Sequence, residues 1–522
     1  MAAGPNLPKK EGGHIEFKER LSKSLHLKGE RRQQLATQLI SRLFEGRGVA
    51  LYVLGVNDDG EVVGLNDLEV EESISVLNSI ANECGAKVER IDRYSTESGW
   101  VVKVLVKSLG VVPGKHVMVA IAGHVNHGKS TLIACLMTGR PDDGNSWLYL
   151  DTLPHEIERR LSADLHFAVI GFKAGSPVLL NNPLDKSERS RLVEDVDKVV
   201  SLVDTVGHLG FLSTTLRGLT GQEIDYGVLV VAADDGPTQV TKEHLGVMLA
   251  LGVPVIICIT KTDLVSRERL DEVREEVARV LKRVGRVPFH LKSLDDVQLV
   301  IDKLNVLVPI IETSAITLNG YDRLYSILSS LTPRPRPIDK PFLLYIDKIY
   351  EIDNVGPVVS GSVKQGRLIP GRELLIGPFS NGLFKRVKTK SIETHHARLM
   401  EALPGLVVGI ALRGVKRDDV KRGMVLCDVE LNPTAVWRFE AETIVLGNPT
   451  RLSVGYEPVI HCHTIVQSVR VIDLEKEYLR TGEEGLVKYE FKYSPALIFK
   501  GDRFVLREGR TKGIGTVTRI LE

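Results

Sequence analysis

A single loop, A-G-H-V-N-H-G-K-S-T at residues 122–131, constrains the fold of this chain more than any other feature. It fits the pattern G-x-x-x-x-G-K-[ST], follows the apolar run V-M-V-A-I-A-G and precedes the helical pattern T-L-I-A-C-L-M. In a strand–loop–helix context the glycines allow a tight turn, and backbone amides face phosphate groups. Lys129 would neutralise phosphate oxygens, and Ser130 can offer its hydroxyl to Mg²⁺. The loop therefore predicts a nucleoside-phosphate site on an α/β sheet.

A second stretch, V-V-S-L-V-D-T-V-G-H at residues 199–208, predicts where a metal ion and the terminal phosphate would lie. Asp204 ends an apolar strand, so its carboxylate can hold Mg²⁺ through water. Gly207 follows closely, and its amide can sense the γ-phosphate. The spacing therefore predicts a site for a nucleoside triphosphate.

Two further stretches indicate which base is bound. I-C-I-T-K-T-D (257–263) places Asp263 just past another apolar strand. A buried carboxylate there accepts from the N1–H and N2–H₂ donors of guanine, and adenine would leave it unpaired. E-T-S-A (312–315) adds the amides of Ser314 and Ala315, which can donate to the base carbonyl. Together with the loop, these stretches predict that the ligand is GTP or GDP.

The chain before the loop predicts a small α+β unit within residues 14–110. A helix through L-A-T-Q-L-I-S-R-L-F should stop at residues 45–48, where E-G-R-G interrupts the pattern. V-A-L-Y-V-L-G-V then predicts a strand, a tight turn at residues 57–60 and a returning partner strand, E-V-V-G-L. A second helix should end at Gly85, and V-V-K-V-L-V-K closes the unit as a strand.

The rest of the chain changes character twice. Continuous apolar runs after His116 are typical of a mostly parallel sheet covered on both faces. After the proline-rich stretch S-L-T-P-R-P-R-P-I-D-K-P, which ends at Pro341, short strands and Gly-rich turns predict two β-barrels. We therefore expect a multidomain chain: an N-terminal α+β domain (1–112), a P-loop α/β domain (113–335) and two β-barrel domains (336–431 and 432–522), with a linker at 109–114.

Composition narrows the setting in which the protein works. No segment of the 522 residues reaches the roughly 18 apolar residues of a membrane span, and the first residues lack a signal-peptide pattern. We therefore expect a cytoplasmic monomer without membrane contact. Five scattered cysteines form no C-x-x-C pair, and His461-Cys462-His463 is interpreted as alternating strand positions, not a zinc site. We expect these thiols to be reduced.

Charge is segregated although the net charge is only +1. Residues 1–50 hold ten Lys and Arg against five Asp and Glu, and residues 381–425 hold ten against four. Such runs are often solvated surfaces, but two of them leave room for contact with nucleic acid.

The motifs G-H-V-N-H-G-K, D-T-V-G-H, T-K-T-D and S-A resemble those of the translational GTPases, and two barrels after such a domain resemble the elongation factor Tu/1-alpha layout. The chain is further identified as an archaeal-type member of the family of GTP-binding proteins 1 and 2. This resemblance rests on L-F-E-G-R-G-V-A-L-Y-V-L-G-V-N-D-D-G-E-V-V-G-L in the N-terminal unit, H-L-G-F-L-S-T-T-L-R-G-L-T, T-K-E-H-L-G-V-M-L-A-L and, near the C-terminus, F-V-L-R-E-G-R-T-K-G-I-G-T-V.

The resemblance implies roles that spacing alone does not. The segment at residues 155–172 matches switch I, and Ser162 falls where a Thr usually joins Mg²⁺ together with Ser130 and Asp204. His208 matches the histidine that positions the attacking water, and Val125 would belong to an apolar gate beside it. The catalytic residues would be His208 and Lys129. The nucleotide would contact Gly123, His124, Val125, Asn126, His127, Gly128, Lys129, Ser130, Thr131, Asp204, Gly207, Thr260, Lys261, Asp263, Ser314 and Ala315.

Three residues depart from the family pattern. Asn126 replaces an Asp beside the phosphates, and Val206 replaces a Pro, which frees the backbone of switch II. Thr260 replaces the Asn of N-K-x-D, and so loses an amide that contacts the base and braces the phosphate loop. We expect Asp263 to retain guanine specificity, with the stem of Lys261 packed along the base plane.

The family implies RNA partners for the barrels. Candidate phosphate contacts are Arg386, Lys388, Lys390, Arg507, Arg510 and Lys512. The favoured hypothesis is a GTPase that binds tRNA and the ribosome and hydrolyses GTP when activated, in elongation, rescue or RNA surveillance. The alternative is a GTP-regulated, RNA-binding adaptor that recruits RNA-decay factors to mRNA.

Overall fold

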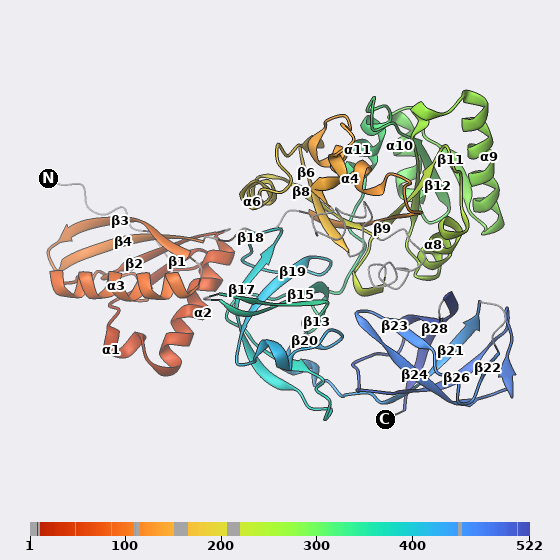
Figure 1. Cartoon of the computed structure of the whole chain (residues 1–522). Coiled ribbons are helices and arrows are strands. Elements are labelled where there is room, and N and C mark those ends of the chain that lie inside the picture. The colour runs from red at the N-terminus through yellow and green to blue at the C-terminus, as the bar shows by residue number, and fades with distance from the viewer. Residues whose placement is uncertain are drawn as a thin grey trace.

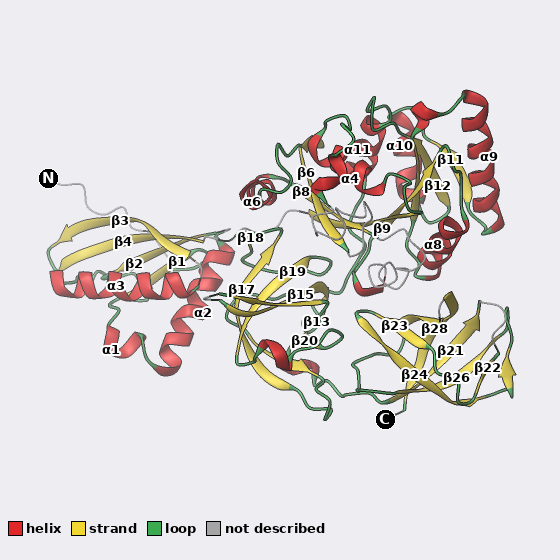
Figure 2. Cartoon of the chain, in the orientation of Figure 1, coloured by secondary structure: helices red, strands yellow, loops and turns green. Residues whose placement is uncertain are grey.

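The structure is a computed structural model that describes residues 8, 11–46, 48–84, 86–108, 110, 115–150, 165–205, 220–353, 355–446, 451–508 and 510–521. Four modules follow one another along the chain (Figure 1). The N-terminal module (red to orange) lies at one end and contacts the first barrel (cyan), the α/β module lies above the two barrels, and the second barrel is blue. Figure 2 shows that helices are concentrated in the first two modules, as the sequence predicts.

In the N-terminal module, helices cover one face of a four-stranded sheet with the order β1-β2-β4-β3. An N-capping box between Asn66 and Glu69 starts its helix α3, which satisfies two backbone donors at the helix end. The elements are β1 (Ile15–Lys18), α1 (Lys23–His26), α2 (Gly29–Glu45), β2 (Val49–Leu54), α3 (Asp67–Glu83), β3 (Ala86–Thr96) and β4 (Gly99–Ser108).

One predicted strand of this module is wrong. Residues 61–65 do not return along β2 as a hairpin partner. They form two isolated bridges, Val56 with Val62 and Leu65 with Trp100. Both edges of β2 are already occupied, by β1 in parallel and by β4 in antiparallel pairing. Gly64 instead turns with φ 78° against the backbone of Ser98, so close that a Cβ there would lie 2.1 Å from the carbonyl oxygen.

The α/β module contains an eight-stranded sheet of order β11-β12-β10-β9-β5-β8-β6-β7. β6 is antiparallel to β8 and β7 is antiparallel to β6, whereas the other neighbouring strands are parallel. The elements are β5 (Lys115–Gly123), α4 (Lys129–Thr138), η1 (Ser146–Tyr149), β6 (His166–Lys173), β7 (Ser176–Val178), α6 (Lys186–Asp195), β8 (Lys198–Asp204), β9 (Tyr226–Ala232), α8 (Gln239–Ala250), β10 (Val255–Thr260), η3 (Thr262–Leu264), α9 (Arg267–Arg283), β11 (Val287–His290), α10 (Asp295–Val300), η4 (Ile301–Lys303), β12 (Leu307–Glu312) and α11 (Tyr321–Ser330).

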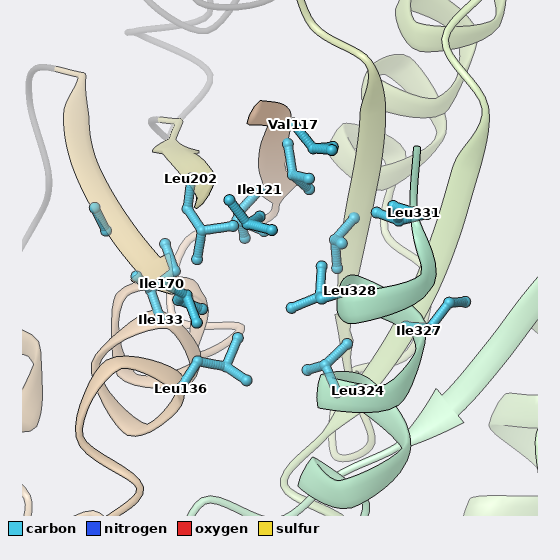
Figure 3. Packing of buried hydrophobic residues seen from close by; sticks show 14 of the residues in the cluster. Val117, Ile121, Ile133, Leu136, Ile170, Leu202, Leu324, Ile327, Leu328 and Leu331 are labelled. Carbon is cyan, nitrogen blue, oxygen red and sulfur yellow. The ribbon is translucent and has the colours of Figure 1, made fainter. Parts of the chain in front are cut away.

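Helices pack on both faces of this sheet, which explains the continuous apolar runs of its strands. On one face, Ile133 and Leu136 of α4 and Leu324 of α11 meet Val117 and Ile121 of β5 (Figure 3). On the other face, α8 and α9 cover a second apolar cluster. The prediction of a mostly parallel sheet is confirmed.

Two closed β-barrels complete the chain, also as predicted. The first closes because β13 pairs with both β20 and β15, and the second closes through β21 and β28. The elements of the first are β13 (Leu343–Tyr345), β14 (Lys348–Ile352), β15 (Gly356–Gln365), β16 (Glu373–Gly377), β17 (Lys385–Thr394), β18 (Ala397–Arg398), β19 (Val407–Arg413), η5 (Arg417–Asp419), β20 (Val425–Cys427) and η6 (Val429–Leu431). Those of the second are β21 (Arg438–Val445), β22 (Leu452–Ser453), β23 (Val459–Cys462), β24 (Ile465–Leu474), β25 (Tyr478–Leu479), β26 (Glu484–Phe491), β27 (Arg503–Glu508) and β28 (Arg510–Ile520).

Residues 394–400, which we name the junction segment, touch three modules. His395 and His396 form its turn with φ 46° and 70°. The ring of His395 is half-buried, with Nε2 2.6 Å from the hydroxyl of Ser201 on β8. At the other end, Met400 lies in the apolar core of the N-terminal module. The first barrel is thereby attached to both modules through seven consecutive residues.

In the part of the chain that the structure describes, no helix is both long and apolar enough to span a membrane.

Candidate functional site

The phosphate loop lies between β5 and α4, at the carboxyl edge of the parallel strands. Gly123 has φ 155°, and a Cβ there would lie 2.4 Å from the carbonyl oxygen of Val230 on β9. Gly128 starts α4 in a left-handed conformation, with φ 84°. Asn126, an exposed residue at the loop tip, also has a positive φ of 60°, which asparagine tolerates better than most residues. The two glycines and Asn126 together give the loop its tight shape.

Lys129 and Ser130 extend from the first turn of α4 toward the same edge. The Lys129 side chain is only 6% exposed, and its Nζ donates to the carbonyl oxygen of His124 at 2.9 Å. The Ser130 hydroxyl donates to Oδ2 of Asp204 at 2.7 Å, at the end of β8. An ammonium, a hydroxyl and a carboxylate therefore meet at one helix N-terminus, which is the chemistry needed to hold a phosphate with a divalent cation.

His127 connects the loop to two neighbouring strands. Its carbonyl oxygen accepts from the Thr260 hydroxyl at 2.7 Å, and its Nε2 lies 2.9 Å from Oδ2 of Asp235. Its Nδ1 accepts from the backbone N–H of Ala232. Burial lowers the pKa of His127, and the hydrogen bond from the ring lowers the pKa of Asp235. The lowered pKa of His127 favours the neutral ring, and its Nδ1 also lies 3.3 Å from the carbonyl oxygen of Val230.

The amide that the sequence analysis finds missing at Thr260 has a structural substitute. The Thr260 hydroxyl, 5% exposed at the end of β10, replaces the missing amide as the donor to the loop. The sequence indicates a lost amide, but it does not reveal that the hydroxyl of Thr260 reaches the carbonyl oxygen of His127.

The base side of the site is more open. Asp263 lies in η3, and its side chain is exposed. The sequence predicts a buried carboxylate here, so burial would require a bound base to cover Asp263. Lys261 has φ 58°, and its Nζ lies 3.1 Å from Oδ2 of Asp234. This ion pair fixes the head of Lys261, while its stem remains half-exposed beside the site.

Ser314 and Ala315 lie where β12 ends, close to the base side. Ser314 is buried, and its N–H donates to the carbonyl oxygen of Asn319 at 3.1 Å, which uses the amide predicted to meet the base. The carbonyl oxygen of Ala315 accepts from Asp142 N, 2.9 Å away.

The other predicted nucleotide contacts are either half-buried or outside the described residues. Val125 and Thr131 are half-buried on either side of Lys129. The predicted residues Ser162, Val206, Gly207 and His208 lie outside the described residues, as do most residues of the predicted linker at 109–114.

His244 on α8 is a residue that the sequence reasoning missed. Its side chain is 1% exposed, and among the described residues its Nδ1 has no hydrogen-bond partner. Burial, together with the nearby charge of Lys129, lowers its pKa to about 3. Its spacing on an apolar helix face is the only signal in the sequence, and that spacing is equally typical of a core residue.

The predicted basic contacts are divided between the two barrels. Arg386 pairs with Glu373 at 3.2 Å, and Lys388 lies opposite Arg413 on the neighbouring strand. Lys390 donates to the carbonyl oxygen of Val355. On its other side Lys388 lies opposite Glu373 of β16, so the like charges of Lys388 and Arg413 are partly offset within the sheet. Arg507 is half-buried, and the side chains of Arg510 and Lys512 lie outside the described residues.

A second polar cluster joins the two barrels. Cys462, His463 and Asp502 bring three potential ligand atoms within 4.8 Å of one another. Nζ of Lys364, however, lies 2.9 Å from Oδ1 of Asp502 and 2.8 Å from Nε2 of His463. The ammonium neutralises the carboxylate, so the cluster is an ion pair between the barrels. Burial raises the pKa of Asp502, but its interactions with His463 and Lys364 outweigh burial and lower the pKa.

Comparisons with known proteins agree with this architecture. Three family models match, described as elongation factor Tu GTP binding domain (residues 114–334), elongation factor Tu domain 2 (356–427) and elongation factor Tu C-terminal domain (432–521).

Three curated relatives cover most of the chain. The chain is 34% identical to GTP-binding protein 1 of Xenopus laevis, over 94% of this chain and 77% of the relative. It is 32% identical to GTP-binding protein 2 of Mus musculus, over 98% and 88%. It is 31% identical to elongation factor 1-alpha of Pyrococcus furiosus, over 71% and 89%.

Solved structures support the fold. A bacterial selenocysteine-specific elongation factor aligns with a TM-score of 0.57 at 22% identity, over 77% of this chain and 58% of that one. Elongation factor SelB of Methanococcus maripaludis, in complex with the GTP analogue GppNHp, aligns with the same TM-score at 21% identity, over 78% and 80%.

Proposed function

The chain belongs to the family of translational GTPases that includes GTP-binding proteins 1 and 2, and from this premise we propose that it binds tRNA and the ribosome and hydrolyses GTP to GDP when the ribosome activates it. GTP hydrolysis itself is the activity of the family's GTPase domain. Elongation, ribosome rescue and RNA surveillance are the processes in which such a switch would act.

The observation that carries this proposal is the meeting of Lys129, Ser130 and Asp204 at the N-terminus of α4. The hydroxyl and carboxylate oxygens, 2.7 Å apart, are the donors that Mg²⁺ prefers, so the residues present fit this ion. Ser130 and Asp204 would hold it, with Ser162 as a third ligand. Bound there, the ion would neutralise phosphate charge. Lys129 would bind the β- and γ-phosphate oxygens, and Asp263 would select guanine.

We assign the hydrolytic step to His208 as the residue that orients the attacking water. Phosphoryl transfer depends mainly on positioning and on charge stabilisation, so a histidine placed by an external partner suits a regulated switch. GTP hydrolysis should be compared between the wild type and His208→Ala, with and without ribosomes. Stimulation that is lost in the variant, with GDP affinity unchanged, supports the proposal, and no stimulation of the wild type contradicts it.

The partner should be RNA that the barrels contact through Lys388, Arg413 and neighbouring basic residues. RNA crosslinked to the protein in the presence of a non-hydrolysable GTP analogue should be mainly tRNA and ribosomal RNA. Recovery chiefly of mRNA would instead favour the adaptor hypothesis, in which hydrolysis is incidental. We propose a cytoplasmic monomer for either role.

A further inference from the structure

We propose that Asp235 and Thr260 clamp His127 and thereby hold the phosphate loop in its binding shape, so that these two positioning residues set the lifetime of bound guanine nucleotide. The inference rests on the nucleotide site proposed above. It assigns a role to two side chains that do not themselves need to touch the ligand.

The first half of the clamp acts on the loop backbone. The Thr260 hydroxyl donates to the carbonyl oxygen of His127 at 2.7 Å and is almost fully buried. The next residue along the loop, Gly128, lies with its Cβ position 3.8 Å from the same hydroxyl. A peptide plane fixed at its carbonyl is also fixed at its N–H, so the bond orients the amide of Gly128. That amide belongs to the row that faces a bound phosphate.

The second half acts on the side chain of the same residue. The His127 ring is 2% exposed and held at both nitrogens, by Asp235 at Nε2 and by the backbone N–H of Ala232 at Nδ1. The Asp235 carboxylate can only accept, so Nε2–H donates to it, while Nδ1 lies 3.2 Å from the backbone N of Ala232 and 3.3 Å from the carbonyl oxygen of Val230. His127 is thus held on three sides, by side chains or backbone from the ends of two strands.

The clamp also connects the phosphate side to the base side. Asp234, next to Asp235, pairs with Lys261, next to Thr260. The two strands that carry these pairs are neighbours, and the N–H of Ala233 donates to the carbonyl oxygen of Thr260 at 2.9 Å. Two consecutive residues just after β9 and two at the end of β10 therefore hold the loop and each other.

Loss of the clamp should accelerate release of phosphate-bearing ligands specifically. Removing one buried hydrogen bond changes an equilibrium or rate by about tenfold. A ligand without phosphates does not use the loop amides, so its affinity should not change. This contrast separates a positioning role from general damage to the module.

The test is the dissociation rate of a fluorescent GDP analogue from the full chain and its variants. Thr260→Val removes the hydroxyl at constant shape, and Asp235→Ala removes the acceptor of His127. Each should accelerate dissociation about tenfold, whereas Thr260→Ser retains the donor and should stay within about twofold of the wild type. Thr138→Val is a matched control, because that buried hydroxyl donates to the carbonyl oxygen of Ala134 within α4. Its dissociation rate should not change.

Guanosine affinity, measured by competition, gives the second readout. It should be the same in the wild type and Asp235→Ala. Unchanged GDP dissociation in both variants overturns the clamp, and so does a loss of guanosine affinity as large as the loss for GDP. Failure of the wild type to bind GDP at all would instead refute the nucleotide site itself, so the two proposals fail in different ways.

Discussion

The two sides of the nucleotide site differ in how much of their final geometry exists without a ligand. On the phosphate side, Lys129 and Asp204 are buried and hydrogen-bonded to the loop and to Ser130. On the base side, Asp263 is exposed, and Lys261 is held by an ion pair at its head only. A preassembled side loses little freedom when ligand binds, whereas the open side must become ordered around the base. We infer that the phosphates supply most of the affinity and that the base supplies discrimination.

The strongest test of this comparison is Lys129→Ala. Removing a nearly buried cation that pairs with phosphate should reduce GDP affinity by about a hundredfold or more. Isothermal titration calorimetry with GDP and with guanosine would measure the contribution of each side to affinity. The affinity for guanosine should change little. A loss of GDP affinity below about tenfold would contradict the inferred dominance of the phosphate side.

Asp263→Asn tests the base side. The amide cannot accept both guanine donors, so GDP affinity should fall by about thirtyfold or more, and xanthosine diphosphate should gain because its C2 carbonyl accepts from the new N–H. Competition assays with GDP and xanthosine diphosphate would measure whether the variant prefers the second nucleotide to the first. If both affinities fell equally, Asp263 would have a structural role only.

Thr260→Asn places an amide where the two sides meet. It keeps a donor for the His127 carbonyl oxygen and adds a second N–H toward the base. Dissociation of GDP should therefore slow by about threefold to tenfold. Stopped-flow measurement of a fluorescent GDP analogue would show it, and faster release would mean that the threonine brace cannot be replaced by an amide.

The smallest effect concerns pH. Burial lowers the pKa of His244 to about 3, so between about pH 6.5 and that value the unfolded chain binds a proton that the folded chain does not. The contribution of His244 to the free energy of unfolding is therefore fully present above pH 6.5. It falls as the solution is acidified, by about 1.4 kcal/mol per pH unit for one such histidine. His244→Gln should reduce the slope of unfolding free energy against pH by that amount. Denaturant titrations at pH 7 and pH 5 would measure it, and an unchanged slope would show that His244 takes up its proton in the folded protein.

The sequence specifies the phosphate side better than the base side or the N-terminal module. The G-x-x-x-x-G-K-S pattern, the strand before it and the Asp204 stretch are local signals, and the sheet places them together. Contacts such as His127 with Asp235 join residues 108 positions apart, and no spacing rule encodes them. β3 was missed because its sequence, A-K-V-E-R-I-D-R-Y-S-T, is polar and mostly exposed at the sheet edge. The predicted hairpin at residues 61–65 failed because a turn signal cannot reveal that two other strands already flank β2.

The junction segment has a practical consequence for anyone who shortens the chain. Met400, 7% exposed, belongs to the core of the N-terminal module although it lies nearly 300 positions beyond it. A protein expressed from residue 115 onward would keep the nucleotide site and both barrels, but it would present this methionine to solvent. Gly110 packs against the backbone of Leu399 and Met400, so the cut would uncover the neighbouring backbone as well. We expect the truncated protein to aggregate through this exposed apolar side chain. Replacing Met400 with a polar residue should reduce that aggregation.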